Sequence, residues 1–281
     1  MQWRGRRTSQ NVEDRRGRSI KGIAGGGIGT VILILVVMFM GGDPTAVINN
    51  IQVQNQQNSS YVQTAETDEL AEFASVVLAE TENVWTELLG KENINYIKPK
   101  LVLYSGAVES ACGTAGSSTG PFYCPQDQSV YIDLSFFTEL NERFHAPGDF
   151  AMAYVIAHEI GHHVQNSLGT IEKVYSLQSR MSEKDFKRYL VRMELQADYY
   201  AGVWAHFAER INILDEGDIE EALNAASAVG DDRIQKIEYG RVVPDSFTHG
   251  TSEQRKRWFN KGYVSGTIRG GNTFDVSDAN L

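Results

Sequence analysis

A segment of five residues combines two possible metal ligands with a possible general base. It reads His158-Glu159-Ile160-Gly161-His162. Residues i and i+4 of an α-helix share a face, so the imidazoles of His158 and His162 can bind one metal ion. Glu159 would then point toward a water on that metal and could accept its proton. Gly161 is a weak helix former, which predicts a close approach of another segment at this point.

Two acidic residues downstream could complete the site. Glu194 and Asp198 lie four apart in a strongly helical run over about 186–210, so they share one helix face. Two histidines and one glutamate form a known set of catalytic zinc ligands, with the fourth position left for water. Asp198 could accept a hydrogen bond from the second ring nitrogen of a ligating histidine. The alternative is that both carboxylates belong to a solvated helix face.

These motifs resemble those of the gluzincin metallopeptidases, which pair HExxH with a downstream ExxxD. More closely, the chain resembles the neutral zinc metallopeptidases of the YpfJ-like family. The matching segments cover nearly all of the chain beyond residue 42, at 112–114, 120–125, 130–137, 158–165, 194–198, 200–205, 230–232 and 249–255. The resemblance implies a zincin-like fold and a zinc-dependent peptidase that acts on polypeptides. Tyr199 departs from the family, in which cysteine is often expected, but it leaves the ligand set intact.

Amide hydrolysis also requires a donor for the oxygen of the substrate that gains negative charge. His249 comes just before a predicted helix and is our candidate for this catalytic role. A capping or packing role for His249 remains equally open. Tyr199 and Tyr200 could serve instead, although adjacent aromatics on a buried helix are more often part of the core. His163 points about 100° away from its neighbouring ligand and is not expected to bind the metal.

The elements predicted around these motifs indicate an α+β fold. We expect helices at 68–89, 219–229 and 251–263 and more than one helix within 150–210, with a strand at 100–104 and a hairpin of 122–124 with 130–132. Thr251 and Gln254 form a capping-box pattern. The prediction is a zincin-like, mainly helical body with a small sheet, preceded by one transmembrane helix. The strand at 130–133 is the candidate sheet edge for the substrate backbone, and an interior position is the alternative.

The N-terminal region has the pattern of a membrane anchor. Positions 1–21 contain seven basic and two acidic residues, and positions 22–42 contain no charged residue. We expect 1–21 to be a basic cytoplasmic tail. Twenty-one helical residues span roughly the 30 Å hydrocarbon core. We therefore expect a single-pass anchor at 22–42 in a bacterial inner membrane, a flexible polar linker at 43–67 and a periplasmic or extracellular peptidase domain at 68–264. A flexible tail should follow at 265–281, and a cleaved signal peptide is the alternative to the anchor.

Charge and cysteine content limit the partners and the compartment. Beyond residue 21 the chain carries 19 basic and 34 acidic residues, which argues against nucleic acid as a ligand. Cys112 and Cys124 are the only cysteines, and in an oxidising compartment they could form a disulfide. Two free thiols in a cytoplasmic domain are the alternative.

Three functions are compatible with these motifs. The first is a membrane-anchored zinc metallopeptidase that uses a metal-activated water. The second is a zinc amidohydrolase acting on a non-protein amide, such as a cell-wall crosslink. The third is an inactive zincin-fold scaffold, against which the complete set of His158, His162, Glu159, Glu194 and Asp198 argues.

Overall fold

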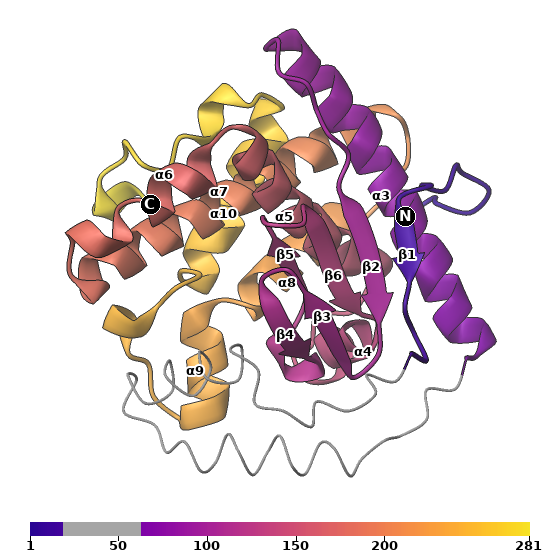
Figure 1. The fold of residues 1–281 in the computed structure, drawn as a ribbon, viewed down its shortest axis with the longest axis horizontal. Helices are drawn as coiled ribbons and strands as arrows, with labels where there is room; N and C mark the ends of the chain where they lie inside the picture. Colours follow the sequence, from indigo (N-terminus) through magenta and orange to yellow (C-terminus); the bar gives the residue numbers. More distant parts are fainter. Residues whose placement is uncertain (19–62) are drawn as a thin grey trace.

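A four-stranded sheet in the order β1-β2-β6-β5 forms the centre of the computed structural model, which describes residues 1–18 and 63–281 (Figure 1). The strands are β1 (Val12–Asp14), β2 (Lys100–Tyr104), β5 (Phe122–Cys124) and β6 (Ser129–Asp133). Strand β2 is parallel to both β1 and β6, whereas β5 and β6 form the predicted antiparallel hairpin. Because β6 is paired on both sides, the strand predicted as the edge is interior, and β5 is the edge instead.

The two faces of the sheet are buried by different partners. Side chains alternate between the faces of a strand, and in β2 Leu101 and Leu103 join the core beneath the helices. Val102 and Tyr104 point the other way, into a small cluster with Val108 of the hairpin β3 (Ala107–Ser110) and β4 (Gly113–Gly116). The central strand is therefore apolar along nearly its whole length.

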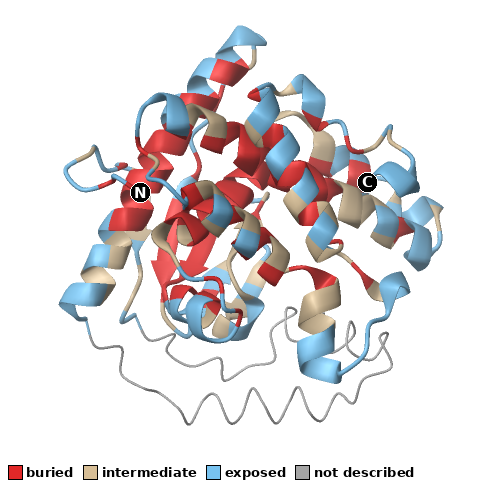
Figure 2. Ribbon diagram, turned by 180° about the vertical axis from the view of Figure 1, so that it is seen from behind, coloured by how far each residue is buried: buried red, intermediate tan, exposed pale blue. Residues whose placement is uncertain are grey.

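The described residues contain eight helices in addition to the sheet. They are α3 (Ala65–Lys91), α4 (Ser135–Glu142), α5 (Asp149–Ser167), α6 (Thr170–Tyr175), α7 (Glu183–Arg210), α8 (Asp218–Ala228), α9 (Asp231–Tyr239) and α10 (Ser252–Ser265). The predicted capping box is present at α10, where Thr251 and Gln254 bind each other's backbone N–H. Figure 2 shows the buried residues concentrated at the centre, where the helices meet the sheet.

Helices α5 and α7 approach closely at the glycine of the HEIGH segment. A Cβ atom on Gly161 would lie 2.8 Å from the carbonyl oxygen of Ala197 and 3.0 Å from its Cα. Only a residue without a side chain allows two helix backbones to come so near. The close approach predicted at Gly161 is therefore present, and it places the histidines of α5 beside the acidic residues of α7.

The first eighteen residues belong to the same folded unit as the helices. Strand β1 pairs with β2, and the arginines before and after it bind carboxylates of α3: Arg6 binds Glu80, Arg7 binds Glu82, and Arg16 binds Asp68. Glu82 is only 1 % exposed and also accepts hydrogen bonds from Ser9 and Asn11. Arg6 and Arg7, which belong to the predicted cytoplasmic tail, thus pair with two buried acids of α3.

The transmembrane part of the predicted fold class is wrong for the described structure, while the α+β architecture agrees with it. Within residues 1–18 and 63–281, no helix is both long and apolar enough to cross a membrane. The segment 22–42 and most of the predicted linker lie outside the described residues.

The C-terminal residues are packed rather than loose. Thr273 is fully buried, and the guanidinium of Arg192 on α7 donates hydrogen bonds to the carbonyl oxygens of Thr273 and Val276. The amide of Gln196 donates to the carbonyl oxygen of Gly271. The backbone of the segment predicted as a flexible tail thus supplies acceptors for these two side chains.

Candidate metal centre

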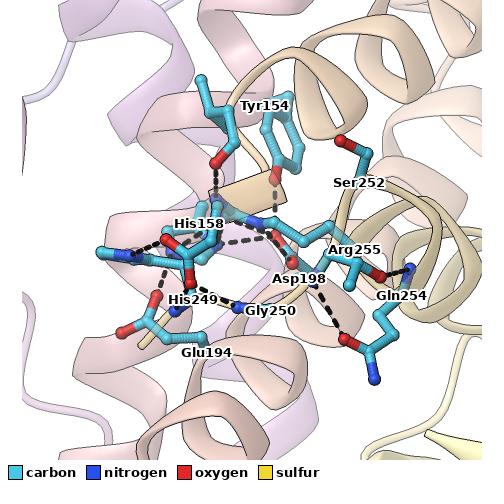
Figure 3. A network of polar contacts seen from close by, with 12 residues as sticks. Tyr154, His158, Glu194, Asp198, His249, Gly250, Ser252, Gln254 and Arg255 are labelled. Atoms are coloured by element: carbon cyan, nitrogen blue, oxygen red, sulfur yellow. Dashed lines mark hydrogen bonds and ion pairs between the residues drawn. The ribbon is translucent and has the colours of Figure 1, made fainter. Parts of the chain in front are cut away.

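Helices α5 and α7 bring three ligand groups to one point. His158 and His162 project from α5, and Glu194 projects from α7. The Nε2 atom of His158 lies 3.2 Å from Oε2 of Glu194, and Nε2 of His162 lies 3.5 Å from Oε1. One ligand atom from each residue lies within 4.8 Å of the other two. Figure 3 shows His158 and Glu194 facing each other in this arrangement.

The donor set fits zinc in type and spacing. Imidazole nitrogens and carboxylate oxygens bind Zn²⁺ at about 2.0–2.2 Å, so tetrahedral ligand atoms lie about 3.3–3.5 Å apart. The separations of 3.2 and 3.5 Å are on this scale. Three protein ligands leave one position for water or substrate, as in a catalytic rather than a structural zinc site.

Asp198 orients the imidazole of His158. Its Oδ1 atom lies 2.8 Å from Nδ1 of His158, so Nδ1–H donates and, in the neutral ring, Nε2 carries the lone pair that a metal requires. Asp198 is fully buried and also accepts from the hydroxyl of Tyr154 and from the guanidinium of Arg255 (Figure 3). The carboxylate is thereby fixed from three directions.

His162 has a different partner, which the sequence reading missed. Its Nδ1 atom lies 2.9 Å from Oε1 of Gln165, a fully buried residue three positions further along α5. The amide nitrogen of Gln165 donates to the carbonyl oxygen of Met193 and to Oε1 of Gln196, so its oxygen must face the histidine. Gln165 therefore leaves Nε2 of His162 free for a metal. The i, i+3 spacing was a signal for this contact, since such residues are neighbours on a helix.

Glu159 and His163, two further polar residues of the HEIGHH segment, are also buried on α5. Glu159 is 8 % exposed and follows His158 directly on α5. His163 is buried, with Nε2 donating to the carbonyl oxygen of Ile97 at 2.6 Å and Nδ1 accepting from the hydroxyl of Tyr123 at 2.9 Å. Both ring nitrogens of His163 are thus engaged away from the three ligands, as expected for a residue that does not bind the metal.

His249 lies at the edge of the site on a loop that Asp231 holds in place. Oδ2 of Asp231 accepts the backbone N–H groups of Thr248, His249 and Gly250, and Oδ1 lies 3.1 Å from Nδ1 of His249. The imidazole remains 51 % exposed. Partial desolvation lowers its pKa, but Asp231 and then Glu194 raise the pKa above the ordinary value.

The buried carboxylates and imidazoles of the cluster shift one another's pKa. Burial raises the pKa of Glu194, but the imidazoles of His162 and His158 lower it well below the usual value. Burial also raises the pKa of Asp198, which Arg255 and His158 lower. For His158 burial lowers the pKa, whereas Asp198 and Glu194 raise it to about 9. Both carboxylates are therefore ionised at neutral pH.

The predicted disulfide is present on the far side of the edge strand. Cys112 lies in the turn between β3 and β4, and Cys124 ends β5; the two are bonded, with their Cα atoms 5.8 Å apart. Strand β5 packs against α5, the helix that carries both histidines. The disulfide thus ties the β3–β4 hairpin to the strand beside the candidate site.

The chain belongs to the family described as "Putative neutral zinc metallopeptidase", whose pattern matches residues 1–274. It is 49% identical over 287 residues to "Uncharacterized protein YpfJ" of Escherichia coli strain K12, covering 99% of this chain and 100% of that protein. It is also 43% identical over 206 residues to "Uncharacterized protein Mb2605" of Mycobacterium bovis, covering 69% and 67% of the two chains. Among solved structures, none matches the chain. The family resemblance inferred from the motifs is therefore confirmed.

Proposed function

We propose that this protein is a zinc-dependent metallopeptidase that hydrolyses peptide bonds. The observation that carries the proposal is the convergence of His158, His162 and Glu194, with each imidazole oriented by a buried partner. These three residues would hold zinc, which supplies Lewis-acid activation of water and of the scissile carbonyl. Family membership supports the same assignment.

The remaining residues of the site have roles that follow from their positions. Glu159, one residue beyond His158 on the buried face of α5, accepts a proton from the attacking water and passes it to the leaving amine. Asp231 engages Nδ1 of His249 and favours the protonated imidazole, whose Nε2–H is then a donor. We assign this donor to the substrate oxygen that gains negative charge.

The test uses the full chain, because strand β1 is part of the domain. Zinc content is measured by mass spectrometry, and hydrolysis of an unfolded protein is followed beside hydrolysis of cell-wall peptide crosslinks. We expect one zinc per chain and cleavage of the protein substrate. Glu159→Gln should keep zinc and lose at least about a hundredfold in kcat. Glu172→Gln, an exposed glutamate of α6, is the matched control and should behave like the wild type.

Each alternative outcome contradicts a specific part of the proposal. A folded wild type that takes up no zinc would refute the metal centre. Full activity in Glu159→Gln would refute the general base. Cleavage of cell-wall crosslinks with no cleavage of proteins would replace the peptidase by an amidohydrolase.

We further propose that the domain works in an oxidising compartment, outside the cytoplasm. The Cys112–Cys124 disulfide supports this, since disulfides are rare in reducing compartments. Alkylation of intact cells without reductant should leave both thiols unmodified. Labelling of both cysteines in freshly lysed cells would place the domain in the cytoplasm.

A further inference from the structure

Helix α10 inserts a buried guanidinium into the candidate metal centre. Arg255 is 4 % exposed, and all three of its nitrogen atoms have partners. Nε lies 2.9 Å from Oδ2 of Asp198, Nη2 lies 3.0 Å from Oδ1, and Nη1 donates to the carbonyl oxygen of Val229 at 3.0 Å. This is a two-pronged contact with one carboxylate, which fixes the carboxylate in both position and plane.

The same guanidinium lies against the imidazole of His158. Nη2 is 3.3 Å from Nδ1 and 3.5 Å from Nε2 of that ring. A permanent positive charge so close to a cation site is repulsive by itself. Its position is explained by Asp198, whose Oδ1 contacts both the arginine and the histidine and whose charge balances that of the guanidinium (Figure 3).

We propose that Arg255 is a positioning residue for the metal centre, acting through Asp198. The fork of the guanidinium sets the carboxylate so that Oδ1 receives Nδ1–H of His158 and Nε2 faces Glu194. A single ammonium cannot make the same pair of parallel hydrogen bonds, so lysine cannot replace arginine here. This inference rests on the zinc site proposed above and adds to it a residue from a third helix.

The experiment compares full-length wild type with Arg255→Lys and Arg255→Met. The control is Arg257→Lys, an exposed arginine two residues further along α10. Zinc affinity is measured by chelator competition, and the absorption spectrum of the cobalt-substituted protein reports the geometry of the ligands. We expect zinc to bind at least about tenfold more weakly to Arg255→Lys and more weakly still to Arg255→Met, with altered cobalt spectra in both. The control should match the wild type.

The lysine variant is decisive because it keeps the positive charge at position 255 but loses the two parallel hydrogen bonds to Asp198. Wild-type zinc affinity and cobalt spectrum in folded Arg255→Lys would overturn the proposal. If Arg255→Met does not fold, the double variant Arg255→Met with Asp198→Asn removes both charges from the buried pair. We expect it to fold and to bind zinc weakly, and wild-type zinc binding in it would also overturn the proposal. A wild type that binds no zinc would instead refute the zinc site itself.

Discussion

Replacing Gly161 by alanine should weaken zinc binding more than it weakens the fold. The new Cβ would lie 2.8 Å from the carbonyl oxygen of Ala197, so α5 and α7 must separate by roughly half an ångström to reach ordinary contact. The histidines are on one of these helices and Glu194 is on the other. Since metal–ligand distances tolerate only about 0.2 Å, this separation disturbs the ligand set directly.

The stability terms partly cancel in this variant. Overpacking costs about 1–3 kcal/mol, while replacing glycine by alanine within a helix stabilises by about 1 kcal/mol. The expected net loss in unfolding free energy is therefore about 0–2 kcal/mol. Zinc affinity should fall by about tenfold or more, a loss comparable to that from removing a residue that orients a ligand.

The assay measures thermal unfolding with and without a chelator, together with zinc affinity by competition. Gly90→Ala is the matched control: Gly90 lies near the end of α3, and a Cβ there meets nothing within 4 Å. This control should be as stable as the wild type or slightly more stable, with unchanged zinc affinity. Wild-type zinc affinity in Gly161→Ala would refute the argument that the spacing of the two helices sets the metal geometry.

Three further predictions concern the N-terminal segment, the disulfide and pH. Replacing 19–62 by a linker of about ten Gly/Ser residues should leave folding and zinc binding intact, because Arg16 and Asp68 are in contact. Deleting 1–62 should destabilise the domain by several kcal/mol, because buried Glu82 loses its contacts with Arg7, Ser9 and Asn11. Both are measured by urea unfolding, and a stable 63–281 fragment would contradict this view. Cys124→Ser should raise KM for protein substrates with zinc content unchanged, since β5 lies beside α5; loss of zinc would contradict it. Zinc must displace the proton of His158, whose pKa is raised to about 9, so zinc affinity should fall as the pH decreases below 9. Chelator competition from pH 9 to pH 6 measures this, and a pH-independent affinity would contradict the prediction.

Contacts between residues close in sequence were predictable. His158 and His162, and likewise Glu194 and Asp198, share a helix face because the α-helix repeats every 3.6 residues. The capping box of α10 and the β5–β6 hairpin are local for the same reason. The contact of Gln165 with His162 follows from the same spacing and could have been read in advance.

The basic N-terminal segment shows where composition misleads. A run of arginines before an apolar segment has two physical uses, a membrane topology signal or a set of ion pairs, and the sequence does not distinguish them. Arg6 and Arg7 bind the carboxylates of Glu80 and Glu82 on α3, which lie 74 and 75 residues further along the chain. Only the folded chain shows that these charges are already paired.

The pattern of the sequence determined the ligand set and the helices that carry it, because both depend on the regular geometry of a helix. The tertiary structure decided which residues orient those ligands. Arg255 contacts Asp198, 57 residues away in the sequence, and Asp231 contacts His249, 18 residues away. Which residues become such partners depends on how α7, α9 and α10 pack against one another. The local periodicity of the sequence does not determine this packing.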